Sequence, residues 1–263
     1  MSNRPIRVCL TIAGSDSGGG AGIQADLKAF ARAGVHGTTA ITAITAQNTV
    51  AVTSVAAVAP ELVLAQVRAV LDDLGVDAVK VGMLGSTATI AAVAQALALF
   101  PPGTPIVVDP VMVAESGARL LDEGAEDALR HMILPLATVV TPNVPEARAL
   151  AHDDSLEGAA LARAVHALGP GAVIITGGHR AEATDVLFDG AATFEIPGVR
   201  HPGGGAHGSG CTHSSTLAAQ LALGASLIDA ATTARSVAGE AVRDGLRSIG
   251  SGPGPANVLG LGR

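Results

Sequence analysis

Short, uninterrupted runs of apolar residues recur along the chain and alternate with longer segments of helical periodicity. Continuous Val, Ile and Ala runs are typical of strands that are buried on both faces, whereas half-exposed strands alternate apolar and polar residues. The pattern therefore predicts parallel strands joined by crossover helices. The six predicted strands are residues 7–13, 38–46, 78–83, 105–109, 138–141 and 172–176.

The segments between these runs carry apolar residues at helical spacing. In residues 60–74, Val63, Val67 and Val70 share one face, and Pro60 stands near the start, where a helix tolerates proline. The other predicted helices are residues 22–32, 87–99, 118–134, 156–168, 212–223 and 227–249. We expect them to cover both faces of a central, mostly parallel sheet, which is an α/β architecture.

The remaining segments indicate how the domain is completed. Residues 185–189 and 192–196, separated by a two-residue turn, predict a hairpin at the sheet edge. We expect residues 50–60 to form a covering flap, and the Gly- and Pro-rich residues 250–263 to form a loosely ordered tail. Without an internal repeat or a long polar linker, residues 1–263 are predicted to be a single domain.

Composition and charge exclude several classes of protein. The net charge of −7 and the lack of Trp and Tyr argue against a nucleic-acid binder, which needs a basic surface and stacking side chains. Residues 33–60 carry no charge but are interrupted by polar side chains, so we expect no membrane span. The apolar run that ends at Ala13 is too short for a signal peptide, which predicts a cytoplasmic protein. Two cysteines do not make a disulfide framework in a chain of this size.

Two glycine-rich segments each precede a predicted helix, where backbone N–H groups and the helix dipole favour an anion or a polar ligand. The first, residues 14–22, lacks the third glycine of a dinucleotide fingerprint, since Ile23 stands there. The second, residues 203–212, resembles a phosphate loop in which Cys211 replaces the lysine. Placed at a helix N-terminus, the Cys211 thiol is expected to have a lowered pKa. The alternative for Cys211 is a small buried hydrophobic side chain.

Polar residues at predicted strand ends are candidates for metal and ligand binding. Asp109 and Glu146 are of the type that binds Mg²⁺, although either is equally compatible with a helix-capping role. Gln47 follows a strand, and its amide is able to pair with the edge of a heteroaromatic ring, or simply to complete a polar turn. The histidines near Cys211, His201, His207 and His213, match no zinc-binding spacing, so solvated loop histidines are the favoured interpretation. The alternative is that His207 or His213 lines the phosphate pocket.

Taken together, these motifs resemble the hydroxymethylpyrimidine and phosphomethylpyrimidine kinases of thiamin biosynthesis, within the ribokinase-like superfamily. The matching stretches are AGSDSGGGAGIQADLK (13–28), TAQNT (45–49), VKVGM (79–83), VDPVMV (108–113), SGARLL (116–121), TPNVPEA (141–147), TGGH (176–179) and GSGCT (208–212). They occur in the family's order over most of the chain. The resemblance implies a ribokinase-like fold and, often, a homodimer.

The resemblance also implies an activity that uses ATP and Mg²⁺. ATP phosphorylates 4-amino-5-hydroxymethyl-2-methylpyrimidine to its monophosphate, and a second ATP converts that product to the diphosphate. Cys211 would be the catalytic base, and Gly208, Ser209 and Gly210 would complete an anion hole around the transferred phosphate. The implied pyrimidine contacts are Gly14, Asp26, Gln47, Met83 and Val111; the nucleotide contacts are Asn143, Thr176 and Gly178; the metal ligands are Asp109 and Glu146.

Two departures from the family pattern concern charge. Many members have lysine where Thr176 stands, and lysine or threonine where Glu115 stands, so a cation that neutralises phosphate must come from elsewhere. Lys28 and Lys80 are the candidates in nearby motifs, and the sequence places neither.

Two rival functions remain open at the sequence level. A pyridoxal kinase of the same fold also phosphorylates a hydroxymethyl group, and residues 45–49 with Met83 favour the pyrimidine over it. A sensor that binds the pyrimidine without catalysis is disfavoured by the presence of Asp109, Glu146 and Cys211.

Overall fold

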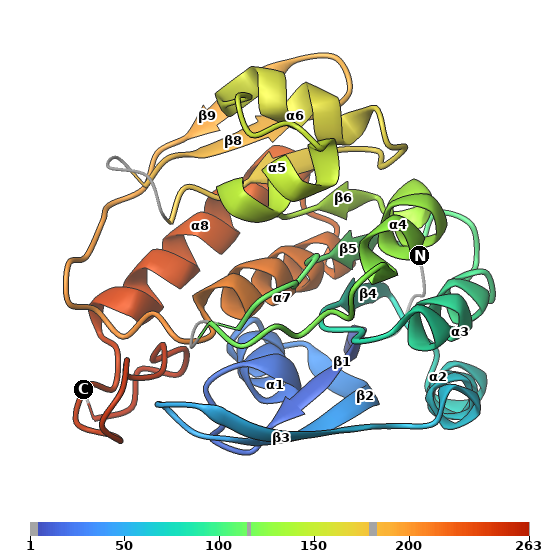
Figure 1. Ribbon diagram of the computed structural model, residues 1–263, viewed down its shortest axis with the longest axis horizontal. Coiled ribbons are helices and arrows are strands. Elements are labelled where there is room, and N and C mark those ends of the chain that lie inside the picture. Colours follow the sequence, from blue (N-terminus) through green and yellow to red (C-terminus); the bar gives the residue numbers. More distant parts are fainter. Residues whose placement is uncertain (1–4, 115–116, 179–182, 263) are drawn as a thin grey trace.

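The computed structural model describes residues 5–114, 117–178 and 183–262. One nine-stranded sheet runs through the molecule in the order β3-β2-β1-β4-β5-β6-β7-β8-β9 (Figure 1). Its strands are β1 (Val8–Asp16), β2 (His36–Gln47), β3 (Val52–Ala57), β4 (Ala78–Val81), β5 (Ile106–Val108), β6 (Val139–Val140), β7 (Val173–Ile175), β8 (Asp185–Phe188) and β9 (Thr193–Ile196). The six strands predicted as apolar runs are all present and pair in parallel, whereas β3, β8 and β9 pair antiparallel.

Helices cover both faces of the sheet, as the pattern predicted. The elements are α1 (Gly22–Arg32), α2 (Pro60–Asp73), α3 (Thr87–Leu97), α4 (Ala125–Ala128), the π-helix η1 (Leu129–Ile133), the 3₁₀-helix η2 (Leu134–Leu136), α5 (Val144–Ala151), α6 (Gly158–His166), α7 (Ser209–Ala222) and α8 (Leu227–Arg243). None of the helices in the described part of the chain combines the length and apolar character needed to cross a membrane.

Alternate residues of β1 pack into two separate hydrophobic cores, one on each face of the sheet. Leu10 and Ile12 of β1 pack toward α2, α3, α5 and α6, whereas Cys9, directly before Leu10, packs toward α1, α7 and α8. This alternation is the two-residue period of a strand, and it explains why a strand buried on both faces reads as a continuous apolar run. The face covered by α1, α7 and α8 carries both glycine-rich turns, because α1 and α7 each begin at one of them.

Several predicted boundaries are wrong for local reasons. The helix expected at residues 118–134 begins only at Ala125, because Gly124 before it has a left-handed backbone, with φ of 80°. The helix expected at 227–249 ends at Arg243, and Gly245 beyond it packs closely against Gly205. Residues 50–60, expected to form a flap, hold the edge strand β3 and the start of α2. Neither β3 nor α5 was predicted.

The expectation of a loose C-terminal tail is also wrong. Residues 254–258 are buried, and Ala256 and Val258 join Ala29 of α1 and Ala241 of α8 in a small core. The amide of Ala256 donates a hydrogen bond to the carbonyl of His207, and that of Asn257 donates to the carbonyl of Ala241. The many glycines in this segment permit close backbone packing, so its composition does not signal disorder.

Candidate active site

A cavity of about 420 Å³ opens at the carboxyl ends of the parallel strands. Ligands of open α/β sheets bind at this edge, beside the point where the strand order reverses. That point is β1, since β2 pairs with one of its sides and β4 with the other. Every predicted site residue except Asp26 lines the cavity: Gly14, Gln47, Met83, Asp109, Val111, Asn143, Glu146, Thr176, Gly178, Gly208, Ser209, Gly210 and Cys211.

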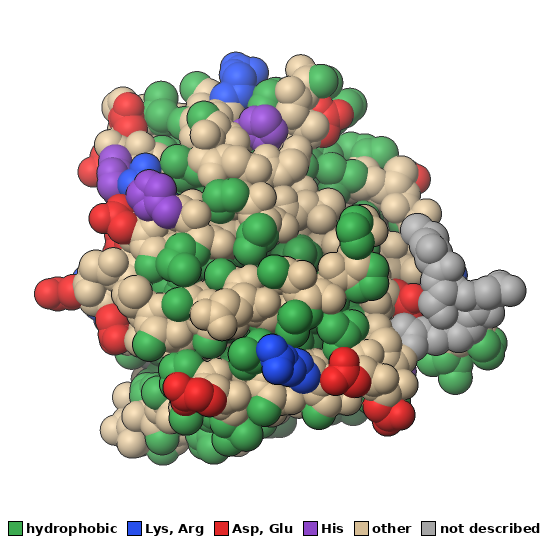
Figure 2. All heavy atoms as spheres, turned by 90° about the vertical axis from the view of Figure 1, so that its right-hand side faces the viewer, with side chains coloured by type: hydrophobic (Ala, Val, Ile, Leu, Met, Phe, Trp, Pro, Cys, Tyr) green, Lys and Arg blue, Asp and Glu red, His purple; other side chains and the backbone are tan. Residues whose placement is uncertain are grey.

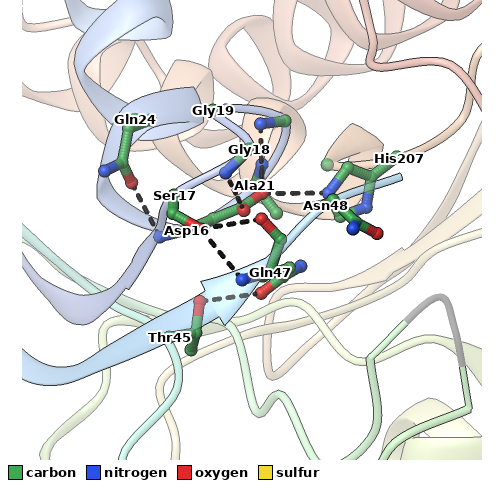
Figure 3. Close-up of polar contacts among 12 residues, drawn as sticks. Asp16, Ser17, Gly18, Gly19, Ala21, Gln24, Thr45, Gln47, Asn48 and His207 are labelled. Atoms are coloured by element: carbon green, nitrogen blue, oxygen red, sulfur yellow. Dashed lines mark hydrogen bonds and ion pairs between the residues drawn. The ribbon is translucent and has the colours of Figure 1, made fainter. Parts of the chain in front are cut away.

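One wall of the cavity is made by Gly14, Met83 and Gln47. Gly14 lies against Met83, and a Cβ on residue 14 would come within 3.1 Å of the Met83 sulfur. The amide oxygen of Gln47 accepts a hydrogen bond from the Thr45 hydroxyl at 3.1 Å, and the Gln47 backbone pairs with the Ser17 hydroxyl (Figure 3). This wall combines an apolar surface with an oriented amide, as a small heteroaromatic ring requires.

The N-terminus of α7 forms the floor of the cavity. Gly208 caps the helix with φ of 81°, and a side chain there would overlap the carbonyl of Gly20, so only glycine fits. Gly210 and Cys211 lie in the first helical turn, where N–H groups have no acceptor within the helix. Such a helix end is suited to an anion.

The structure corrects the expected pKa of Cys211. Burial raises the pKa of this thiol, the charge of Lys80 lowers it, and the carboxylates of Asp26 and Asp109 raise it again, leaving a pKa of about 12. The helix N-terminus was expected to dominate. It does not, because burial has the largest effect on the pKa, and the charges of Asp26 and Asp109, which no local sequence motif places together, raise it further.

Lys80 is the functional residue that the sequence left unplaced. It lies in β4, is fully buried and reaches the cavity wall, with its Nζ 3.0 Å from Asp26 Oδ1 and 3.9 Å from Asp109 Oδ2. Burial alone lowers the pKa of Lys80, but the charges of Asp26 and Asp109 outweigh it and leave the pKa raised. The sequence signal was a lysine inside an otherwise apolar strand. Lys28 instead donates to the carbonyl of Gly19 and does not line the cavity.

The structure also corrects the role of Asp26. This carboxylate is fully buried behind the cavity wall, where it accepts hydrogen bonds from Thr11, Ser215 and Lys80. It therefore does not reach a ligand in the cavity. Its contribution is to hold the Lys80 ammonium, which does reach the cavity.

Asp109 and Glu146 both line the cavity, and their charges interact. Burial raises the pKa of Asp109, and burial together with the charge of Asp109 raises the pKa of Glu146 to about 8. Two carboxylates that repel each other are stabilised by a divalent cation, and oxygen ligands are those that Mg²⁺ prefers. The residues therefore fit a magnesium ion completed by water and phosphate oxygens. Glu146 also forms a capping box with Asn143 at α5, so the capping interpretation holds as well.

The histidines near Cys211 do not form a zinc site. His207 pairs with Asp16 and His213 pairs with Asp185, each at 3.0 Å from the Nε2 atom. In residues 5–114, 117–178 and 183–262, no cluster of three or more His, Cys, Asp or Glu side chains is arranged for a metal. The interpretation as solvated loop histidines is wrong for His207 and His213, which are both buried and line the cavity.

The far end of the cavity carries the predicted nucleotide contacts. Asn143 and Thr176 are bridged backbone to backbone, and Gly178 follows in the next turn. Thr176 supplies no charge. Arg235 of α8 also lines the cavity, and its Nη1 atom lies 3.7 Å from Oδ1 of Asp185. No sequence motif marks Arg235, which occupies one polar position on an amphipathic helix. His179 and Glu115 lie outside the described residues.

A helix N-terminus suited to an anion, an apolar wall with an oriented amide, and two carboxylates, all at the edge of a ribokinase-like sheet, are the parts that a small-molecule kinase requires. The family model for phosphomethylpyrimidine kinase matches residues 16–257. A hydroxymethylpyrimidine/phosphomethylpyrimidine kinase of Rhizobium meliloti is 50% identical over 258 residues, covering 95% of this chain and 96% of that protein. The chain belongs to the phosphomethylpyrimidine kinase family.

Solved structures of two kinds of kinase have the same fold. A phosphomethylpyrimidine kinase from Clostridium difficile is 38% identical, with a TM-score of 0.77 over 88% of this chain and 96% of that one. A pyridoxal kinase from Staphylococcus aureus, in complex with pyridoxal, is 30% identical, with a TM-score of 0.87 over 99% of this chain and 96% of that one. The fold therefore does not by itself separate the two acceptors.

Proposed function

We propose that this protein transfers a phosphoryl group from ATP to the hydroxymethyl group of 4-amino-5-hydroxymethyl-2-methylpyrimidine, and a second one to the resulting monophosphate. The observation that carries the proposal is one cavity that joins the Gly14, Gln47 and Met83 wall to the N-terminus of α7. The 50% identical relative named for both kinase activities supports it.

In this mechanism the ring lies against Met83 while Gln47 pairs with its polar edge. The N–H groups at the start of α7 stabilise the phosphoryl group in flight, since preorganised donors act where charge develops. Lys80 adds a positive charge beside that point. Asp109 and Glu146 would hold Mg²⁺, which supplies charge neutralisation on the phosphates when bound. Asn143, Thr176 and Gly178 would contact the nucleotide, and Arg235 would provide the cation that Thr176 lacks.

Turnover on two alcohols tests the proposal. Purified protein with ATP and Mg²⁺ is expected to phosphorylate the pyrimidine alcohol with a higher kcat/KM than pyridoxal. Gln47→Leu should reduce the preference, because an unpaired buried polar group costs about 1 to 3 kcal/mol, or roughly a factor of 5 to 150. Equal kinetics for wild type and variant would exclude Gln47 from recognition.

Pyridoxal phosphorylation is the second candidate, favoured by the likeness to the Staphylococcus aureus pyridoxal kinase across 99% of this chain. A higher kcat/KM for pyridoxal would establish it. Absence of ATP consumption with either alcohol would instead revive the non-catalytic sensor.

We also propose that two copies of the chain associate through the edge formed by β2 and β3. The exposed residues there include Ile44 and Val55, with relative exposures of 56% and 48%, and residues 33–60 contain no Asp, Glu, Lys or Arg. An uncharged, exposed strand edge invites pairing unless another chain covers it. The cytoplasmic location expected from the sequence stays a prediction.

A further inference from the structure

The two glycine-rich turns at the cavity are packed directly on each other. A Cβ on Gly208 would overlap the carbonyl oxygen of Gly20, and a Cβ on Gly20 would overlap the ring of His207. No side chain therefore fits between the turn that leads into α1 and the turn that leads into α7. The first turn starts at the ring-binding wall, and the second ends in the anion-binding helix terminus.

Asp16 of the first turn and His207 of the second turn form a hydrogen bond across this contact (Figure 3). Asp16, at the end of β1, accepts hydrogen bonds from the backbone amides of Gly18, Gly20 and Ala21 at 2.8, 3.0 and 2.8 Å. Its Oδ2 atom also lies 3.0 Å from Nε2 of His207, which belongs to the second turn. Both side chains are buried, with relative exposures of 3% and 8%.

The charged form of Asp16 is the native one. Burial raises its pKa, but the hydrogen bonds from His207 and from the amides of Ala21 and Gly18 outweigh burial and leave the pKa lowered. Hydrogen bonds to a carboxylate are stronger than bonds between neutral groups. The hydrogen bonds that Asp16 forms with the two turns are therefore strong as well as buried.

His207 is fixed on its other side by the C-terminal segment. Its carbonyl accepts from the amide of Ala256 at 3.0 Å, and a backbone bridge joins it to Pro255. His207 is also the residue directly before Gly208, the N-cap of α7. A shift of the imidazole would therefore move the helix terminus that is proposed to bind phosphate.

We propose that Asp16 and His207 are a positioning pair that holds the acceptor wall and the anion-binding end of α7 at one fixed separation. The pair touches no reacting atom in this role; it acts through the two turns that it joins. The inference rests on the proposed function, because it assigns the two turns to acceptor and phosphate. A misplacement of about 1 Å between reacting groups is enough to slow a reaction about 100-fold.

The test compares His207→Leu, His207→Gln, Asp16→Asn and the double variant Asp16→Asn/His207→Leu. The amide nitrogen of Gln is a donor that is able to replace Nε2 of His. We expect His207→Leu and Asp16→Asn to lower kcat for both phosphorylation steps by about 10- to 100-fold with little change in KM for ATP. His207→Gln should recover most of the activity, and the double variant should be no slower than the slower single variant, because the two residues act as one unit.

A binding measurement separates positioning from simple folding. In the wild type, the pyrimidine alcohol should tighten binding of ADP with aluminium fluoride, a mimic of the phosphoryl group in transfer, and His207→Leu should abolish that coupling. His166→Leu is the matched control, since His166 packs on Phe188 with ring centroids 5.0 Å apart and does not line the cavity. It should leave kcat and the coupling unchanged.

Two results would overturn the proposal: a lower thermal stability of His207→Leu with unchanged kcat and coupling, or additive losses in the double variant. If His207→Leu does not fold, Asp16→Asn and His207→Gln carry the same comparison. If the wild type does not phosphorylate the pyrimidine alcohol, that result counts against the proposed function. The kcat values of wild type and variants would then be compared with pyridoxal as the acceptor.

Discussion

The thiol of Cys211 is protonated at neutral pH, because burial and two neighbouring carboxylates raise its pKa to about 12. Below that pKa the thiolate fraction rises about tenfold with each pH unit. If Cys211 is the base, the first phosphorylation should accelerate with pH through the neutral range. Cys211→Ala should abolish this slope and lower the rate by about 10²- to 10⁴-fold.

The second phosphorylation is the internal control for Cys211. Its acceptor is an anionic phosphate oxygen, so no proton has to be removed, and Cys211→Ala should slow it much less. The two steps are measured separately, starting from the alcohol and from the monophosphate. Equal losses in both steps would assign Cys211 a structural role in the turn.

Glu146 should make the ligand-free protein less stable as the pH rises. Its pKa is about 8 in the folded protein against an ordinary value of 4.5, so between these values the folded state binds the proton more tightly than the unfolded state. Stability therefore falls with increasing pH across this window, by at most about 1.4 kcal/mol per pH unit, and by less because Glu146 is partly exposed.

Thermal unfolding with a chelator at pH 5 and pH 8 measures this effect. The wild type should lose more stability over the interval than Glu146→Gln, and added Mg²⁺ should restore more of it in the wild type. Parallel curves for the two proteins would show that Glu146 does not carry the shift. Retention of kinase activity after exhaustive chelation would refute the magnesium requirement itself.

At the scale of elements, the C-terminal segment supports the site. Deleting residues 254–263 removes the hydrogen bonds that Ala256 and Asn257 donate and the buried side chain of Val258. We expect a loss of about 2 to 4 kcal/mol in stability and a higher KM for the pyrimidine. Deleting only residues 260–263 is the control, since Gly260 is half-buried and Leu261 and Gly262 are exposed. Equal stability and KM for both truncations would contradict the supporting role.

At the scale of the whole molecule, the edge formed by β2 and β3 differs in charge from the face that bears α2 and α3. Figure 2 shows the face that bears α2 and α3, where the acidic and basic side chains of the described residues stand dispersed among apolar ones. The β2–β3 edge, in contrast, lies in a stretch of 28 residues, 33–60, without Asp, Glu, Lys or Arg. An edge strand left in this state is a template for association.

Ile44→Lys and Val55→Lys test this interface. A charge at each position should convert the dimer to a monomer, because a buried unpaired charge costs several kcal/mol. Sedimentation at several protein concentrations measures the change. Leu223→Lys, at a residue that is 47% exposed at the end of α7, is the control and should leave the association unchanged. A monomeric wild type would refute the proposed dimer.

Much of the site was predictable because its parts are local. Gly208 to Cys211 form a turn followed by a helix, and Asp109 follows a strand, so chain order alone places them at the carboxyl edge of a parallel sheet. For the opposite reason, Lys80 was named as a candidate but not placed, and Arg235 was missed. Each has its role only through side chains from other elements, Asp26 and Asp109 for Lys80 and Asp185 for Arg235.

The parallel strands, the helical faces and the positions of both glycine-rich turns are predictable from the amino-acid sequence alone. These features arise from periodicity and backbone freedom, which act over a few neighbouring residues. Three features become visible only in the folded protein: Asp16 contacts His207, residues 254–258 are buried, and Cys211 has a raised pKa. Each of these depends on burial and charge contributed by segments far apart in the chain, and such electrostatic effects are set by distance in space.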